Sequence, residues 1–168
     1  RYWRSVDGDP VKLAHLKKAF ASAAVMKNLK GGHGDGCNFE ETDRFSQGRR
    51  HAHQAVMYGF LLCFAATSSA TFMHYLFDMP APYPLWSLPK LLGVVGGVML
   101  SLGCLQMIRL KLKADKALSA NNAFSGEIGF IGLLGFVAFS GLLLYLLGNT
   151  ELMSLTLFLH FGAVLAFF

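Results

Sequence analysis

Charged residues are scarce in this chain of 168 residues. Only 15% of them are Asp, Glu, Lys or Arg, and 54% are hydrophobic, whereas about a quarter of a typical soluble domain is charged. This composition excludes a disordered chain and disfavours an ordinary soluble globule. It does not separate one large buried core from a membrane domain, so the order of residues along the chain has to decide.

Cysteine motifs are also lacking. The three cysteines, Cys37, Cys63 and Cys104, form no CxxC pair. The sequence therefore predicts no disulfide framework, zinc ribbon or iron–sulfur site. Cys63 and Cys104 lie in uncharged runs, and we interpret them as small buried apolar side chains. No Ser/His/Asp or Cys/His set has the spacing of a catalytic site, so we assign no catalytic residue.

Charge is absent altogether from four long stretches, residues 54–77, 91–108, 128–147 and 152–168. Each has about the length that crosses a hydrocarbon core of about 30 Å at 1.5 Å per residue. Lipid cannot satisfy open backbone groups, and the runs lack the strict alternation of a membrane barrel, so we expect helices. The predicted fold is an all-α transmembrane bundle of four spans. The short turn at 148–151 predicts that the last two spans are antiparallel neighbours.

The basic residues are unevenly placed. Ten of the 15 Lys and Arg lie in the first 50 residues, four lie between Arg109 and Lys116, and the last is Lys90. The positive-inside rule therefore places the N-terminus and the 109–127 connection in the cytoplasm. The net charge of +5 then indicates a phospholipid surface, and no nucleic acid, as the partner. We divide the chain into a cytoplasmic segment, 1–50, and a transmembrane domain, 51–168.

The cytoplasmic segment has two features. Residues 11–29 predict a helix with one apolar side, which can lie on the membrane surface, cover a partner or pack on its own loop. A glycine-rich loop follows at 31–37, with four glycines in six residues. His33, Asp35 and Cys37 lie in this loop, but three potential ligands without a second cluster do not favour a metal site.

Histidines are the main candidates for function. His74 and His160 lie within predicted spans, where an ionisable residue is a functional candidate by default. His53 precedes His74 by 21 residues, which brings the two within about 60° of one helical face. The rise between them is about 32 Å, so they cannot bind one metal. The stripe from His53 to His74 continues through Met57, Phe60, Phe64, Thr67 and Thr71.

Pairing across two helices is the way in which membrane bundles hold b-type haem. His160 is the natural partner of His74, although their depths match only if the first span extends or the helices tilt. His53 would need a partner after Phe168. From spacing alone, haem ligation and a structural hydrogen bond between helices remain equal alternatives. Likewise, the pair Gly93 and Gly97 and the glycines at 129, 132 and 135 fit either tight helix packing or the approach of a flat macrocycle.

The loop GGHGDGCNF at 31–39 and the sequence RRHAH at 49–53 resemble the membrane part of the tricarballylate/citrate utilization B proteins. The RYWR at 1–4 fits as well. This resemblance implies an N-terminal iron–sulfur region, followed by a membrane domain similar to the di-haem cytochrome b subunit of respiratory nitrate reductase. It further implies electron transport from a partner FAD-dependent tricarballylate dehydrogenase to the quinone pool, in the bacterial inner membrane.

Carried onto this chain, the resemblance favours His53, His74 and His160 as ligands of one or two haem b groups. Because no cysteine run is present, we expect the iron–sulfur clusters only outside these residues. The apolar run that ends at Phe168 and the start at Arg1 lead us to expect a fragment of a longer protein.

Two rival functions remain open. The first is a haem-free membrane anchor for a dehydrogenase. The second is a small-carboxylate transporter whose polar path is lined by Thr67, Ser68, Ser69 and Thr71. The lack of charged residues within the spans disfavours ion or proton coupling. We therefore expect an electron-transfer component of an oxidoreductase system rather than a stand-alone catalyst.

Overall fold

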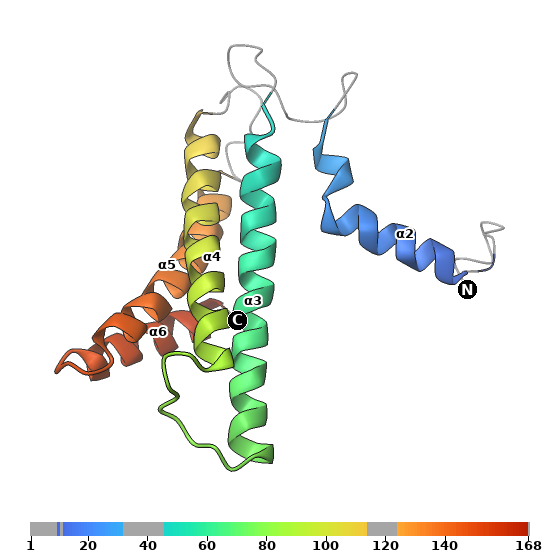
Figure 1. The fold of residues 1–168 in the computed structure, drawn as a ribbon. Coiled ribbons are helices and arrows are strands. Elements are labelled where there is room, and N and C mark those ends of the chain that lie inside the picture. The colour runs from blue at the N-terminus through green and yellow to red at the C-terminus, as the bar shows by residue number, and fades with distance from the viewer. Residues whose placement is uncertain (1–9, 11, 32–45, 114–123, 168) are drawn as a thin grey trace. The chain divides into compact units, whose positions relative to one another are not determined.

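The computed structural model describes residues 10, 12–31, 46–113 and 124–167. The chain divides into two compact units, Arg1–Cys37 and Asn38–Phe168. Every regular element in the described ranges is a helix (Figure 1). The first unit contains α2 (Leu13–Ala24) and the 3-10 helix η1 (Lys27–Leu29). The second contains α3 (Gly48–Leu76), α4 (Leu88–Lys113), α5 (Phe124–Leu147) and α6 (Met153–Phe167).

The predicted helix over 11–29 is interrupted. The α-helix ends at Ala24. Two residues later Met26 takes the left-handed conformation, with φ 47°, and separates α2 from η1. The apolar side of α2 is open, because α2 buries none of its residues, and Leu13 and Phe20 are 68% and 74% exposed. Of the glycine-rich loop only Gly31 is described. The candidate ligands His33, Asp35 and Cys37 lie outside the described residues.

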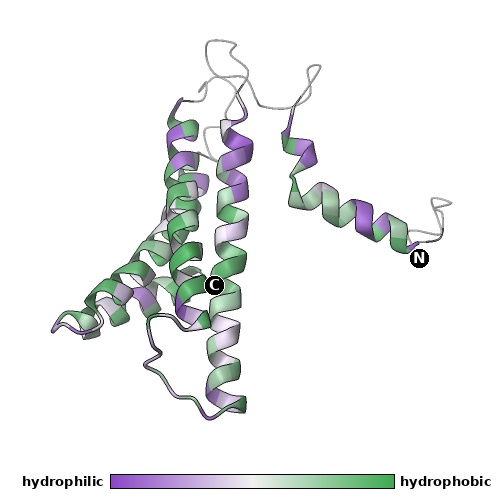
Figure 2. Ribbon diagram, in the orientation of Figure 1, coloured by the Kyte–Doolittle hydropathy of each residue, from purple (hydrophilic) through white to green (hydrophobic). Residues whose placement is uncertain are grey.

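Three helices are long and apolar enough to cross a membrane, namely α3, α4 and α5. Helix α6 is apolar but has only 15 residues, so the fourth span stays a prediction. The helices are longer than the uncharged stretches that predicted them. Helix α3 begins at Gly48 rather than at 54, and α4 continues to Lys113 rather than to 108. Figure 2 shows hydrophilic residues at the start of α3 and at the end of α4, so both basic ends lie at one end of this unit.

Glycine brings α3 and α4 into backbone contact. A Cβ on Gly59 would lie 2.5 Å from the Leu100 amide nitrogen, and one on Gly96 would lie 2.9 Å from the Cys63 amide nitrogen. A Cβ on Gly103 would lie 2.8 Å from the amide nitrogen of Val56. These distances leave no room for a side chain. The two helices are therefore held at a separation that only glycine permits.

The glycine pair singled out in the sequence is not the tight one. A Cβ on Gly93 would meet only Ala66, at 3.7 Å, and Gly97 faces Leu142 of α5. Gly96, between them, makes the close contact with α3. The spacing had left tight helix packing and the approach of a macrocycle open, and the structure shows tight packing at Gly96, about 100° around α4 from Gly97.

Helix α5 packs antiparallel on α4. Gly135 lies against Cys104, because a Cβ added to Gly135 would be 3.1 Å from the Cys104 Cβ. Near the end of α4 and the start of α5, Lys111 makes an ion pair with Glu127. Leu100, Cys104, Leu134 and Ala138 form the buried core. The prediction for Cys104 is confirmed at 2% exposure, and Cys63 is half-buried against the same core.

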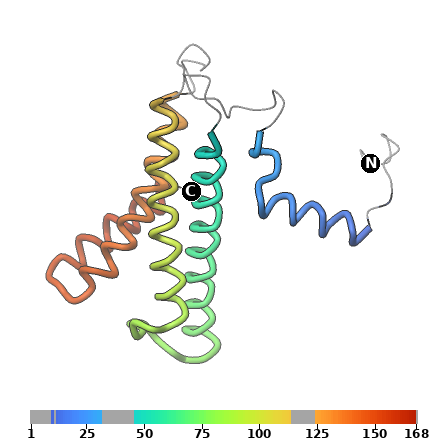
Figure 3. Tube along the Cα trace, turned by 45° about the horizontal axis from the view of Figure 1, so that its top comes forward, coloured from blue at the N-terminus to red at the C-terminus, as the bar shows by residue number. Residues whose placement is uncertain are grey.

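Helix α6 returns along α5, as the turn at 148–151 predicted. The Phe130 and Phe167 rings lie 5.3 Å apart near one end of the hairpin. Figures 1 and 3 show that the α5–α6 hairpin leans away from the α3–α4 pair as it approaches the turn. The packing order therefore follows the chain, α3 on α4, α4 on α5 and α5 on α6.

The Gly96 contact gives a first prediction. Gly96→Val places a branched side chain where a Cβ is already 2.9 Å from the α3 backbone, so we expect a loss of about 3 kcal/mol or more in the free energy of unfolding. The control is Gly129→Val, because a Cβ there meets nothing within 4 Å. Unfolding in mixed micelles measures both. Equal losses in the two variants would show that α3–α4 contact is not what Gly96 provides.

Candidate functional site

The imidazole of His160 is held against α5 near the middle of the hairpin. Its Nδ1 lies 2.9 Å from the hydroxyl oxygen of Ser140, and Ser140 is 2% exposed. Gly141 lies against the ring, since a Cβ there would be 3.2 Å from the His160 Cε1. The neighbouring glycine thus makes the space that the ring occupies.

The hydrogen bonds around Ser140 favour one tautomer of His160. The Ser140 hydroxyl donates its hydrogen to the Val137 carbonyl, 3.0 Å away. Its oxygen is then free to accept a hydrogen bond from the Nδ1–H of His160. In this arrangement Nε2 keeps its lone pair, which is the form of imidazole that binds a metal.

His53 and His74 are both exposed on α3. The residues that α3 buries are Ala52, Gly59 and Ala66, and at 100° per residue His53 lies about 100° around the helix from Ala52 and His74 about 80° from Ala66. The ring of His74 contacts that of the adjacent Tyr75 edge-on, with centroids 4.7 Å apart. Within the stripe between the histidines, Met57 is half-buried, and the exposed members are Phe60, Phe64, Thr67 and Thr71.

The structure does not bring the three predicted ligands together. His160 is roughly level with Gly59, and three contacts between neighbouring helices show this. His160 contacts Ser140 of α5, Leu142 of α5 contacts Gly97 of α4, and Gly96 of α4 contacts Gly59 of α3. From that level His74 is about 22 Å along the axis of α3, and His53 is about 9 Å away in the other direction. Among the described residues, no three or more His, Cys, Asp or Glu side chains are grouped so that they could hold a metal ion. Each histidine is therefore a separate candidate ligand.

Ser140 is the residue that the sequence interpretation missed. Ser140 and His160 lie at nearly equal distances before and after the turn at 148–151. In an antiparallel hairpin such residues face each other, so the turn and the two polar residues in apolar runs were sufficient to predict the contact. The interpretation left a structural hydrogen bond between helices open as an alternative, but it named no hydroxyl partner.

Arg49 and Arg50 lie in the first turn of α3, and the Arg50 guanidinium donates a hydrogen bond to the Gln47 side chain over 3.3 Å. Guanidinium groups at such a helix end are of the kind that bind anionic lipid headgroups.

The Ser140–His160 hydrogen bond gives a second prediction. Ser140→Ala removes a partner of a buried ring N–H, so we expect the free energy of unfolding to fall by about 1 kcal/mol. Thr156→Val is a matched control, because the buried Thr156 hydroxyl donates only to the Leu152 carbonyl of its own helix. Unfolding in mixed micelles compares the two variants. An equal loss in both would mean that the interhelical bond contributes nothing to stability.

Comparison with known proteins now identifies the family. Residues 1–168 match the family model described as "Citrate utilization protein B". The chain is 38% identical over 168 residues to Citrate utilization protein B of Escherichia coli. The matched region covers 100% of this chain and 44% of that relative. The chain thus spans less than half of the relative's length, and no solved structure matches it. A family match over the full chain, together with this identity, shows that the chain belongs to the citrate utilization protein B family.

Proposed function

We propose that this chain is the membrane part of an electron carrier that takes electrons from a partner FAD-dependent tricarballylate dehydrogenase and passes them through haem b to the quinone pool. Family membership, the three membrane-crossing helices and the held imidazole of His160 support this function. His160 is the observation that carries it. Its ring is held on one side by Ser140, and its other nitrogen is left for a metal.

The surroundings of His160 suit a residue that would hold haem. Such a residue needs a neutral ring and a hydrogen bond on the nitrogen that does not bind iron. Ser140 would supply the hydrogen bond, and Gly141 lets the imidazole lie against α5. When bound, haem supplies reversible one-electron chemistry. Ser140 and Gly141 of this chain orient the imidazole against the apolar helix α5.

His53 and His74 are the other proposed ligands. Each is exposed on α3, and the two lie at opposite ends of the stripe. In this position each ring is open to a group that approaches from outside the four helices. The 21 residues between His53 and His74 span about 32 Å, so each histidine would serve a different site, one near each membrane face. We propose one or two haem b groups in total.

The proposed topology places the N-terminus in the cytoplasm of a bacterium, with the protein in the inner membrane and α6 as a fourth span. The basic ends of α3 and α4 lie at the same end of the unit (Figure 2), and the Lys111–Glu127 ion pair lies there too. Grouping of basic residues on one side is what the positive-inside rule requires.

A haem-free anchor is the rival that His160 keeps open, because the bond to Ser140 alone can satisfy a structural histidine. The transporter has less support. The hydroxyls of Thr67, Ser69 and Thr71 donate to carbonyls of their own helix, so they offer no spare hydrogen to a carboxylate. Uptake of tricarballylate or citrate into liposomes tests the transporter directly.

His160→Asn distinguishes a ligand from a structural histidine. The Asn amide can replace the Nδ1–H as donor to Ser140, but it has no counterpart of the Nε2 lone pair. We expect this variant to fold and to lose at least half of the haem measured as pyridine haemochrome in the purified protein. The control is His51→Asn, an exposed histidine on α3 that is not a proposed ligand. Full haem content in folded His160→Asn protein would contradict ligation by His160.

A further inference from the structure

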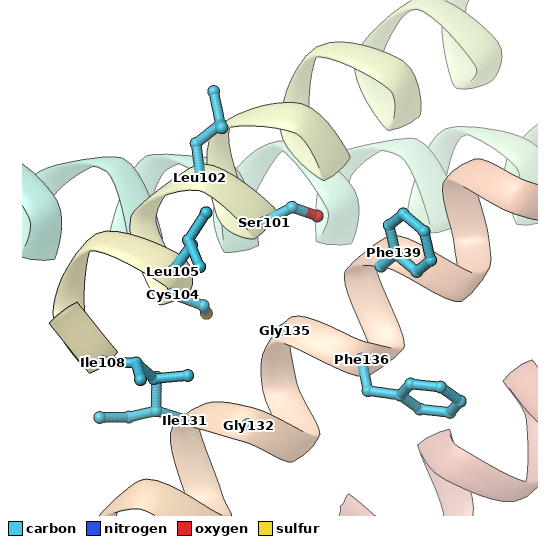
Figure 4. A pocket seen from close by; sticks show the side chains of 10 residues that line it. All are labelled: Ser101, Leu102, Cys104, Leu105, Ile108, Ile131, Gly132, Gly135, Phe136 and Phe139. Carbon is cyan, nitrogen blue, oxygen red and sulfur yellow. The ribbon is translucent and has the colours of Figure 1, made fainter.

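A groove of about 480 Å³ lies between α4 and α5. Figure 4 shows Ser101 and Cys104 of α4 on one side, and Gly135, Phe136 and Phe139 of α5 on the other. The volume is within the range of about 300–1,000 Å³ that small-molecule sites occupy. None of the residues that line it belongs to the His160 contact.

The groove has an aromatic end and an aliphatic end. Phe136 and Phe139 lie at one end, and Ile108 and Ile131 lie at the other (Figure 4). Between them Gly132 leaves the α5 backbone uncovered, because a Cβ on this residue meets nothing within 4 Å. A flat ring can therefore approach the backbone of α5, with a chain extending towards the isoleucines.

One hydroxyl in this apolar groove has no partner. The Ser101 oxygen is buried and makes no hydrogen bond among the described residues, and Figure 4 shows it directed towards Phe139. Serine and threonine in helices commonly donate to a carbonyl one turn back. Thr67, Thr71 and Thr156 do so here. Ser101 instead keeps a free hydrogen beside the aromatic end, and a buried donor without an acceptor is costly.

We propose that the groove binds a lipid-soluble quinone. The ring lies by Phe136 and Phe139, one ring carbonyl accepts a hydrogen bond from Ser101, and the isoprenoid tail runs past Ile108 and Ile131. An acyl chain would fill the same volume but would leave Ser101 unpaired. The inference rests on the proposed function, for which it supplies the site of the electron acceptor.

The groove is also well placed relative to His160. Phe139 borders the groove, and the next residue, Ser140, holds His160 on the side of α5 that faces α6. The two sites therefore lie on different sides of one helix, whose diameter with side chains is about 10–12 Å. No other element has to separate a quinone in the groove from an electron carrier at His160.

Photolabelling tests the site without depending on turnover. The purified protein in phospholipid nanodiscs is illuminated with an azido-quinone, and the labelled peptides are mapped by mass spectrometry. We expect the label within residues 101–108 and 131–139. We expect Ser101→Ala to weaken quinone binding about tenfold, which corresponds to one lost hydrogen bond. Thr67→Val is the control, because the Thr67 hydroxyl is already bonded within α3, and its affinity should be unchanged.

Gly132→Leu provides a second variant that fills the groove. Because a Cβ at this position meets nothing, the protein should fold with unchanged thermal stability and lose the label. Labelling elsewhere, unchanged affinity in Ser101→Ala and Gly132→Leu, or displacement of the quinone by oleate at equal concentration would each overturn the proposal. Haem content, measured on the same samples, separates the two claims. A labelled groove without haem contradicts only electron transfer through haem, and haem without a labelled groove contradicts only the quinone site.

Discussion

Backbone contact between α3 and α4 is the constraint on which the other helices depend. Lipid tails are as apolar as leucine side chains, so the hydrophobic effect does little to pair helices inside a bilayer, and close packing has to do it. Gly59, Gly96 and Gly103 allow that packing, because each brings one helix within contact distance of the other's backbone. Gly97, one residue on from Gly96 and so about 100° around α4, faces Leu142 of α5. One run of small residues thus orders three helices.

Helix α5 then serves two sites. It holds His160 through Ser140 and Gly141 on the α6 side, and its residues Gly132 to Phe139 border the groove on the α4 side. The glycines of α5 make both arrangements possible. Gly135 admits Cys104, and Gly141 admits the imidazole. The stripe on α3 is a third surface, because its two histidines are exposed and remain open to groups outside these four helices.

Much of the fold followed from where charge is missing. The uncharged runs predicted the three long membrane helices, and burial of Cys104 followed from its place in such a run. Which glycine of α4 meets α3 did not follow, because spacing gives a period but not the rotation of the helix. The break at Met26 carries no Gly or Pro signal. The groove depends on packing between residues some 30 positions apart, and neither run alone predicts it.

The central claim is that electrons cross this chain through haem held by histidine. A reduced-minus-oxidised absorption spectrum of the purified protein, recorded without oxygen before and after addition of a soluble quinone, tests it most directly. The account predicts the narrow bands of a low-spin haem b with imidazole ligands, and reoxidation of the haem by the quinone. A folded protein without any haem bands, or with haem that the quinone leaves reduced, would contradict the account.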